Sequence, residues 1–296
     1  MDFCAAFYSS YSGVEEKFFE EIYIGVRSLM DTLKKYLRMF RYELKNSLYC
    51  NRFMFAAAFL FILFGCIYFR RITEGYESVS YLDYCMNMLH GFERIEDKDI
   101  SKDFPVIYMC LGLIISFITG RTMFDDRGYS VLVHGKSRHA WIACKVLSVV
   151  VNTGILYILV IIMSLCFGDK ENTLNAEICR RFFKTDRCAL DCEDTALVTA
   201  VFFLIPLMSS LAVAQIQIVV SLCLGSMPGY IAAIIIYVLS VFEVNPVFIA
   251  NGCMVQRSIY FMEGGIALWS SVLTAAAVIF VTLILQIRLI SVKDWI

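Results

Sequence analysis

The stretch Val146–Phe167, VLSVVVNTGILYILVIIMSLCF, decides the fold of this 296-residue chain. It holds no charged residue, and it is long enough to cross the hydrocarbon core of a bilayer, which takes about 20 apolar residues in a helix. Five other segments share this character or come close to it. We therefore predict an all-α membrane protein with six transmembrane helices, at about residues 53–69, 104–124, 141–167, 196–224, 229–243 and 266–288.

The composition of the whole chain agrees with a membrane protein. Hydrophobic residues make up 59% of it and charged residues 18%, whereas soluble domains are nearer about 45–50% and about 25%. The net charge of −1 gives no basic surface, so we expect no nucleic-acid partner. Met1-Asp2-Phe3 does not begin a secretory signal peptide, and we expect insertion to use the internal spans.

Two of the predicted spans are irregular. Span 196–224 carries Pro206, which lacks an amide hydrogen and predicts a kink or a break in the helix. Span 229–243 is short for a full crossing, and Glu243-Val-Asn-Pro246 follows its apolar part. We expect this helix to stop before or near the far surface, with a re-entrant or surface hairpin before the last span.

The charges of the connecting segments predict the orientation. Lysine and arginine dominate the segment before the first span, the loop between the second and third spans, and the C-terminal tail, and such segments stay in the cytoplasm. Acidic residues outnumber basic ones in loops 70–103 and 168–195, which we place outside together with 243–265. Arg70 and Arg71 argue for the opposite side, but an even number of spans puts both basic termini inside. We expect a multi-pass protein of the cell membrane.

The residues before the first span form two predicted units ahead of the six-span domain, 53–296. Residues 1–25 are an acidic and aromatic extension to which we assign no role. Within residues 26–52, apolar side chains recur at steps of three and four with basic residues between them, and Ser28 with Asp31 makes a capping box. We predict an amphipathic elbow helix in the headgroup plane; the alternative is a cytosolic helix packed on a partner. Its apolar stripe is Leu29, Leu33, Leu37, Phe40, Leu44 and Leu48.

The twelve cysteines show no zinc-type spacing. Five lie in or beside apolar runs, where cysteine behaves as a small hydrophobic residue. Four others lie in polar loops; we expect free thiols there, and a loop disulfide is the alternative. These four are Cys85, Cys179, Cys188 and Cys192.

The sequence holds no motif that predicts an enzyme. His134-Gly135-Lys136-Ser137 resembles the end of a Walker A loop, but Ser130 stands where the first glycine belongs, and the segment lies between two spans. The three histidines are dispersed. We expect no catalytic residue, no metal and no bound cofactor in this chain.

Away from their ends, the predicted spans carry no charged residue, which argues against an ion-coupled carrier, because such carriers bury charged groups in the bilayer. We expect the polar residues within the spans to form hydrogen bonds between helices, and we expect the energy source to be a partner ATPase. They are Asn152, Ser209, Ser210, Gln215, Gln217 and Gln286.

The second span carries small residues at every fourth position, Gly112, Ser116 and Gly120, on one face. Rows of small residues let helices approach each other closely in a membrane. The row therefore predicts a packing surface. Packing within one bundle and a seam between two copies are both open on this pattern.

Several patches, in order along the chain from about residue 36, resemble the type-two permease subunits of ATP-binding-cassette transporters in the form found in Gram-positive bacteria. Their order and spacing on a six-span chain carry the resemblance. The patches are Phe40–Leu48, Tyr81–Tyr84, Phe117–Gly120 through Gly128-Tyr129, Gly135–Arg138 with Trp141 and Lys145, Asn251–Arg257, Gly264-Gly265 and Lys293-Asp294.

The resemblance implies that loop 121–139 supplies a coupling helix that docks on the ATPase. It implies a dimer, either of this chain or with a second permease, and an ATPase subunit that binds ATP and magnesium. Substrates of the family are amphipathic or hydrophobic: peptides such as bacteriocins, drugs or lipids. The alternative function is a membrane sensor or immunity protein that binds a membrane-active peptide without transport. The expected docking residues are Arg127, Tyr129, His134, Lys136, Ser137 and Arg138.

Overall fold

The computed structural model describes Arg27, Met30 and residues 32–76, 78–91, 106–124, 138–185 and 188–292. Helices dominate these residues and no strand occurs among them, so the all-α prediction is confirmed for this part of the chain. Residues 32–50 form a helix that precedes the labelled elements. These are α2 (Arg52–Ile72), α3 (Tyr81–Leu89), α4 (Val106–Met123), α6 (Arg138–Phe167), α7 (Ala176–Phe182), α8 (Thr195–Thr199), η1 (Ala200–Leu204), α9 (Ile205–Leu224), α10 (Ser226–Phe242), η2 (Ile249–Cys253), η3 (Val255–Arg257) and α11 (Leu268–Val292).

Five helical stretches in the described residues are long and apolar enough to cross a membrane, which is compatible with a multi-pass membrane protein. They are α2, α4, α6, α11 and the continuous run Thr195–Leu224, which joins α8, η1 and α9. The fifth predicted span, 229–243, corresponds to α10, which is apolar but shorter, at 17 residues. Its shortness agrees with the expectation that this helix stops early.

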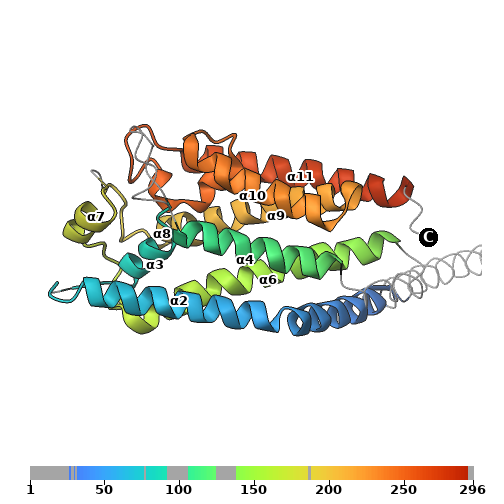
Figure 1. Ribbon diagram of the computed structural model, residues 1–296, viewed down its shortest axis with the longest axis horizontal. Coiled ribbons are helices and arrows are strands. Elements are labelled where there is room, and N and C mark those ends of the chain that lie inside the picture. The colour runs from blue at the N-terminus through green and yellow to red at the C-terminus, as the bar shows by residue number, and fades with distance from the viewer. Residues whose placement is uncertain are drawn as a thin grey trace, which may run out of the picture.

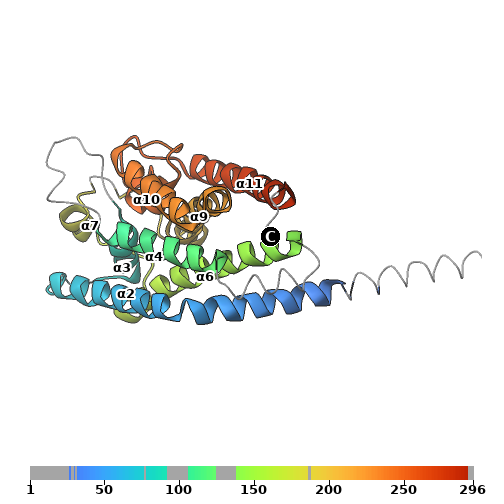
Figure 2. The ribbon, with the colours of Figure 1, turned by 45° about the vertical axis from the view of Figure 1, so that its right-hand side comes forward.

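The long helices run side by side along one axis (Figure 1). The helix 32–50 and the C-terminal part of α11 lie at one end, which we call the terminal end. The short elements α3, α7 and α8 gather at the other end, which we call the loop end; Figure 2 shows the same division from a second direction. An even number of passes through the bundle accounts for both terminal helices reaching the same end.

The outer helices of the bundle expose apolar side chains, as lipid-facing helices must. Phe64 of α2 is 74% exposed and Trp269 of α11 is 78% exposed. The inner helices α4 and α9 bury more of their length, and α9 packs against α10, α11, α4 and α6. Lipid can cover the exposed apolar surface, whereas in water a patch of this size would drive aggregation.

The irregularity expected near Pro206 is a π-helical turn, η1, and the helix does not break there. The amide of Ile205 donates to the carbonyl of Ala200, five residues back. The hydroxyl of Tyr157 donates to the carbonyl of Pro206 at 3.1 Å, which ties the turn to α6. A π turn inside a helix adds one residue to the local hydrogen-bond pattern and so absorbs the missing proline donor.

Helices α9 and α10 form a hairpin with a single connecting residue, Gly225, where the sequence predicted a four-residue gap between spans. Gly225 has φ 103° and ψ 170°, a conformation open almost only to glycine. A Cβ on Gly229 would lie 1.8 Å from the Ser221 hydroxyl oxygen, so the two helices touch through their backbones. The hairpin therefore needs glycine at both positions.

Replacing Gly225 by alanine is expected to lower the free energy of unfolding by about 1–3 kcal/mol, because a Cβ strains this backbone conformation. The matched control is Gly154→Ala in α6, where a Cβ meets no atom within 4 Å. That change should instead stabilise the helix, by up to about 1 kcal/mol. Thermal unfolding of both variants in mild detergent, followed by tryptophan fluorescence, checks the opposite signs; equal melting temperatures would contradict the assignment.

Candidate functional site

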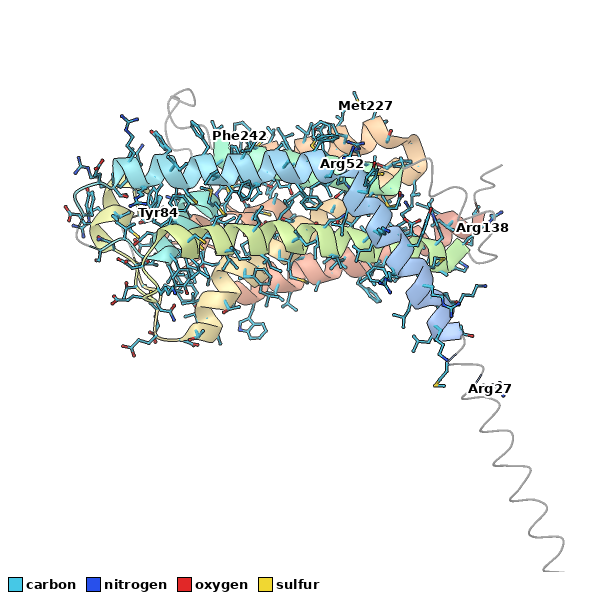
Figure 3. The ribbon with its side chains drawn as sticks, turned by 90° about the horizontal axis from the view of Figure 1, so that it is seen from below. Arg27, Arg52, Tyr84, Arg138, Met227 and Phe242 are labelled. Carbon is cyan, nitrogen blue, oxygen red and sulfur yellow. The ribbon has the colours of Figure 1, made fainter. Side chains whose placement is uncertain are left out.

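The predicted docking segment connects α4 to α6 in the chain, and the end of α4 and the start of α6 both lie at the terminal end. Arg127, Tyr129, His134, Lys136 and Ser137 fall outside the described residues, as do the extension 1–25, Leu29 and the Ser28/Asp31 capping box. Arg138, the first residue of α6, is partly buried, and Figure 3 labels it at this end. The structure thus places the two helix ends that frame the segment.

The helix 32–50 also reaches this place and meets α2 at an angle near Arg52 (Figure 3). Two leucines of the predicted apolar stripe are exposed, Leu33 at 57% and Leu37 at 56%, whereas Phe40, Leu44 and Leu48 are partly buried. The face that packs into the bundle is polar and holds Glu43, Ser47 and Asn51, spaced at every fourth residue. The helix therefore turns Leu33 and Leu37 outward and a carboxylate, a hydroxyl and an amide inward.

The inward carboxylate forms an ion pair deep in the bundle. Glu43 Oε2 lies 3.0 Å from Lys145 Nζ, and the two side chains are 0% and 1% exposed. The Lys145 ammonium also donates to the carbonyl of Thr122 at 2.8 Å and lies 5.8 Å from the centre of the Trp141 ring. The prediction that the spans carry no buried charge is wrong at Lys145, since α6 buries it. A single lysine changes the mean hydropathy of a long apolar helix very little, so the hydropathy of the sequence did not reveal it.

Hydroxyl and amide groups extend this ion pair into a network. The hydroxyls of Ser47 and Thr122 lie 2.8 Å apart. The Asn152 amide donates to Ser47 Oγ at 2.7 Å, and the Asn51 amide donates to Thr122 Oγ1 at 3.1 Å. We call the set Glu43, Ser47, Asn51, Thr122, Lys145 and Asn152 the polar joint.

The polar joint links three elements at the point where they enter the bundle. Thr122 is in the last turn of α4, Lys145 and Asn152 lie in the first half of α6, and the others belong to the N-terminal helix or its junction with α2. Buried polar groups are costly unless they are paired. A shift of α4 relative to α6 must therefore break these bonds or exchange them for others.

The polar joint consists of one ion pair and hydrogen bonds between helices. It offers no nucleophile with an adjacent base, and the described residues contain no cluster of three or more His, Cys, Asp or Glu that could hold a metal ion. Glu43 Oε1, Asn51 Oδ1 and Asn152 Oδ1 are buried without a hydrogen-bond partner among the described residues. These spare acceptors give the network room to rearrange.

The row of small residues on α4 packs within the chain. A Cβ on Gly112 would lie 3.0 Å from the ring of Tyr237 in α10. The Gln217 amide donates to the Ser116 carbonyl at 2.8 Å, and a Cβ on Gly120 would be 3.5 Å from the same amide nitrogen. The row therefore brings α4 close to α9 and α10; a seam between two copies stays a prediction.

The described cysteines are all free thiols. At the loop end, buried Cys179 forms a side-chain hydrogen bond with exposed Cys188. This bond lowers the pKa of Cys188 from 9.0 to about 7, because it stabilises the thiolate, and it raises the pKa of Cys179. Cys188 is therefore the more reactive of the two.

Cys188 is expected to react with iodoacetamide at pH 7 faster than an ordinary thiol, because about half of it is thiolate at its pKa. Removing the donor with Cys179→Ala should slow the labelling of Cys188 by about tenfold, with part of the loss in thiolate offset by higher nucleophilicity. Cys179→Ser keeps a donor and should retain most of the rate. Peptide mass mapping over a time course measures it, and equal rates in the alanine and serine variants would refute the hydrogen bond.

The polar joint is a buried polar network shared by three elements of the described residues. The sequence analysis noted Asn152 as a hydrogen-bonding residue and missed its partners, although the four-residue spacing of Glu43, Ser47 and Asn51 marks one helix face. Comparisons with known proteins add no assignment to this geometry. No family model matches the chain, and no curated protein and no solved structure matches it.

Proposed function

We propose that the chain is the membrane-spanning permease subunit of an ATP-binding-cassette exporter, driven by a separate ATPase polypeptide. The observation that carries this proposal is the polar joint, which ties the N-terminal helix to the end of α4 and the start of α6, the two helix ends that frame segment 125–137 in the chain. In this proposal α10 is the fifth of six spans, both termini are cytoplasmic, and the helix 32–50 lies at the inner surface with its exposed leucines toward lipid.

The ATPase would dock on loop 121–139, with Arg138 and the last turn of α4 as the ends through which movement enters the bundle. Closure of the ATPase around ATP would displace the loop, and the polar joint would pass that displacement to the N-terminal helix. Because packed helices adopt discrete arrangements rather than a continuum, the bundle would alternate between two states. The substrate is an amphipathic or hydrophobic peptide, drug or lipid, and the ATPase alone holds ATP and magnesium.

Purification of the tagged chain from membranes of its own host in mild detergent tests the partner. We expect vanadate-sensitive ATPase activity to co-purify, together with a polypeptide that carries an ATP-binding-cassette sequence. The variant Lys136→Glu/Arg138→Glu should lose both, because it reverses two charges on the docking loop. The control Lys35→Glu/Lys45→Glu makes the same charge change at exposed positions of the N-terminal helix, at the same end, and should retain both.

Wild-type chain that purifies as an intact membrane protein without any ATPase would overturn the proposal. That result would favour a sensor or immunity protein that binds a membrane-active peptide. Loss of the ATPase from both charge-reversed variants would place the contact on the N-terminal helix as well, and so remove loop 121–139 as the specific docking element.

A further inference from the structure

The loop end carries two arginines, Arg70 and Arg71, whose positions do not fit the orientation that the other basic segments predict. Arg70 and Arg71 lie in the last turn of α2, at the end of the bundle opposite the basic termini. Both are exposed. They line a cavity of about 490 Å³ formed by the end of α2, the segment that follows it, α3 and the start of the loop after α6.

The walls of this cavity carry charges of both signs. Arg70 and Arg71 contribute two positive charges, and Glu74 and Asp169 contribute two negative ones. Tyr84, which is 2% exposed, lies between them and is influenced electrostatically by Arg70 and Asp169. Burial raises the pKa of Tyr84, so its hydroxyl stays protonated. A ligand with one anionic and one cationic group matches this lining.

A second arginine contact holds the rim of the cavity in place. Arg181 of α7 donates to the hydroxyl of Tyr76, which lines the cavity, at 3.0 Å. Thr73 is buried, and its hydroxyl donates to the carbonyl of Phe69 at 2.8 Å, which fixes the turn that follows α2. The charged groups are therefore mounted on a rigid turn and braced by a neighbouring helix.

The cavity opens beside the apolar, exposed face of α2. Leu60, Phe64 and Ile67 are exposed at helical spacing along this face, and Ile67 also lines the cavity. Arg71 continues the same row one turn further on. A bound molecule would thus have its polar head among the charges and its apolar part along α2.

We propose that this cavity binds the head of a zwitterionic phospholipid, with its phosphate on Arg70 and Arg71 and its ammonium toward Glu74 and Asp169. Guanidinium groups suit phosphate oxygens because several N–H donors face them in a fixed plane. The two carboxylates discriminate against a purely anionic head, which would face negative charge without a compensating cation. The acyl chains lie along the exposed row of α2. This inference is independent of any ATPase and of the direction in which the chain crosses the membrane.

Native mass spectrometry of the detergent-solubilised chain, titrated with defined lipids, tests the proposal. We expect phosphatidylethanolamine to bind more tightly than phosphatidylglycerol. Arg70→Gln/Arg71→Gln should weaken phosphatidylethanolamine binding by about tenfold or more, because it removes both guanidinium groups that bind the phosphate. Arg180→Gln, at an exposed position of α7 that does not line the cavity, should bind as the wild type does.

Two further measurements distinguish the contribution of the carboxylates from that of the acyl chains. Glu74→Gln/Asp169→Asn should reverse the preference in favour of phosphatidylglycerol, because it leaves only positive charge in the cavity. Free phosphoethanolamine should bind much more weakly than the lipid, because it lacks the acyl chains. Equal binding of both lipids to the wild type, or equal affinities in the wild type and the double arginine variant, would overturn the proposal, as would tight binding of free phosphoethanolamine. Arg70→Lys/Arg71→Lys, which keeps both charges, guards against a folding defect.

Discussion

Replacing Lys145 by methionine should lower the free energy of unfolding by about 3–5 kcal/mol, because it leaves the carboxylate of Glu43 buried without its partner. The ion pair is 3.0 Å long and its side chains are at most 1% exposed, so water does not replace the lost ammonium. The carbonyl of Thr122 loses its 2.8 Å donor in the same step. We expect little folded protein in the membrane and a strongly lowered melting temperature in detergent.

A variant that lacks both charges separates the pair from its surroundings. Glu43→Gln/Lys145→Met removes both charges and should recover more than half of the loss, because no buried charge is then unpaired. Lys45→Met alters an exposed lysine of the helix that carries Glu43, and its free energy of unfolding should stay within about 0.5 kcal/mol of the wild-type value. Thermal unfolding monitored by tryptophan fluorescence gives all three values. A double variant no more stable than Lys145→Met alone would show that the two charges do not act as a pair.

Hydropathy predicted the long helices well because lipid imposes a simple rule on each of them. It misplaced their ends where charged residues continue a helix: α6 begins at Arg138 and α2 continues through Arg70 and Arg71. A run of apolar residues shows where the lipid core is and says little about how far the helix extends beyond it. The short helices α3 and α7 were not predicted, because their stability comes from caps and tertiary packing rather than from length.

The polar joint could not be predicted from the sequence alone, for a different reason. Ser47 and Asn152 are 105 residues apart in the chain, and Ser47 and Thr122 are 75 apart. Periodicity identifies the face that a helix turns inward only when that face is apolar. Here Leu33 and Leu37 of the N-terminal helix face outward, and the buried positions Glu43, Ser47 and Asn51 are polar. In a membrane protein the apolar stripe indicates the lipid side, so the polar residues at every fourth position are the ones to examine.

The early end of α10 has a specific cause, which lies in Arg257. The last carbonyls of a helix have no partner within it, and here the guanidinium supplies one. Arg257 donates to the carbonyls of Val241 and Glu243 at 2.6 Å and 3.1 Å, and also to the carbonyl of Ser240. The side chain is only 1% exposed, and burial lowers its pKa to about 10, so it stays charged at neutral pH.

The loop that carries Arg257 is held by the same contacts. The guanidinium donates to Asn251 Oδ1, and the Asn251 amide donates to the carbonyls of Glu243 and Asn245, each at 2.8 Å. One arginine and one asparagine thus satisfy the end of α10 and fold residues 243–257 back over it. This arrangement lets a helix of 17 residues end inside the protein without exposing its backbone to lipid.

Arg257→Met should therefore lower the free energy of unfolding by about 3 kcal/mol or more, because several buried carbonyls lose their donor at about 1–3 kcal/mol each. Arg257→Lys should recover only part of this, since a single ammonium cannot span the carbonyls that the planar fork reaches. Arg180→Met, at an exposed position of α7, is the matched control and should have little effect. Thermal unfolding in mild detergent measures the order wild type, lysine variant, methionine variant. If the lysine variant matches the wild type, charge alone rather than the fork stabilises the end of α10; if the methionine variant also matches it, the cap contributes nothing, and the helix must end there for another reason.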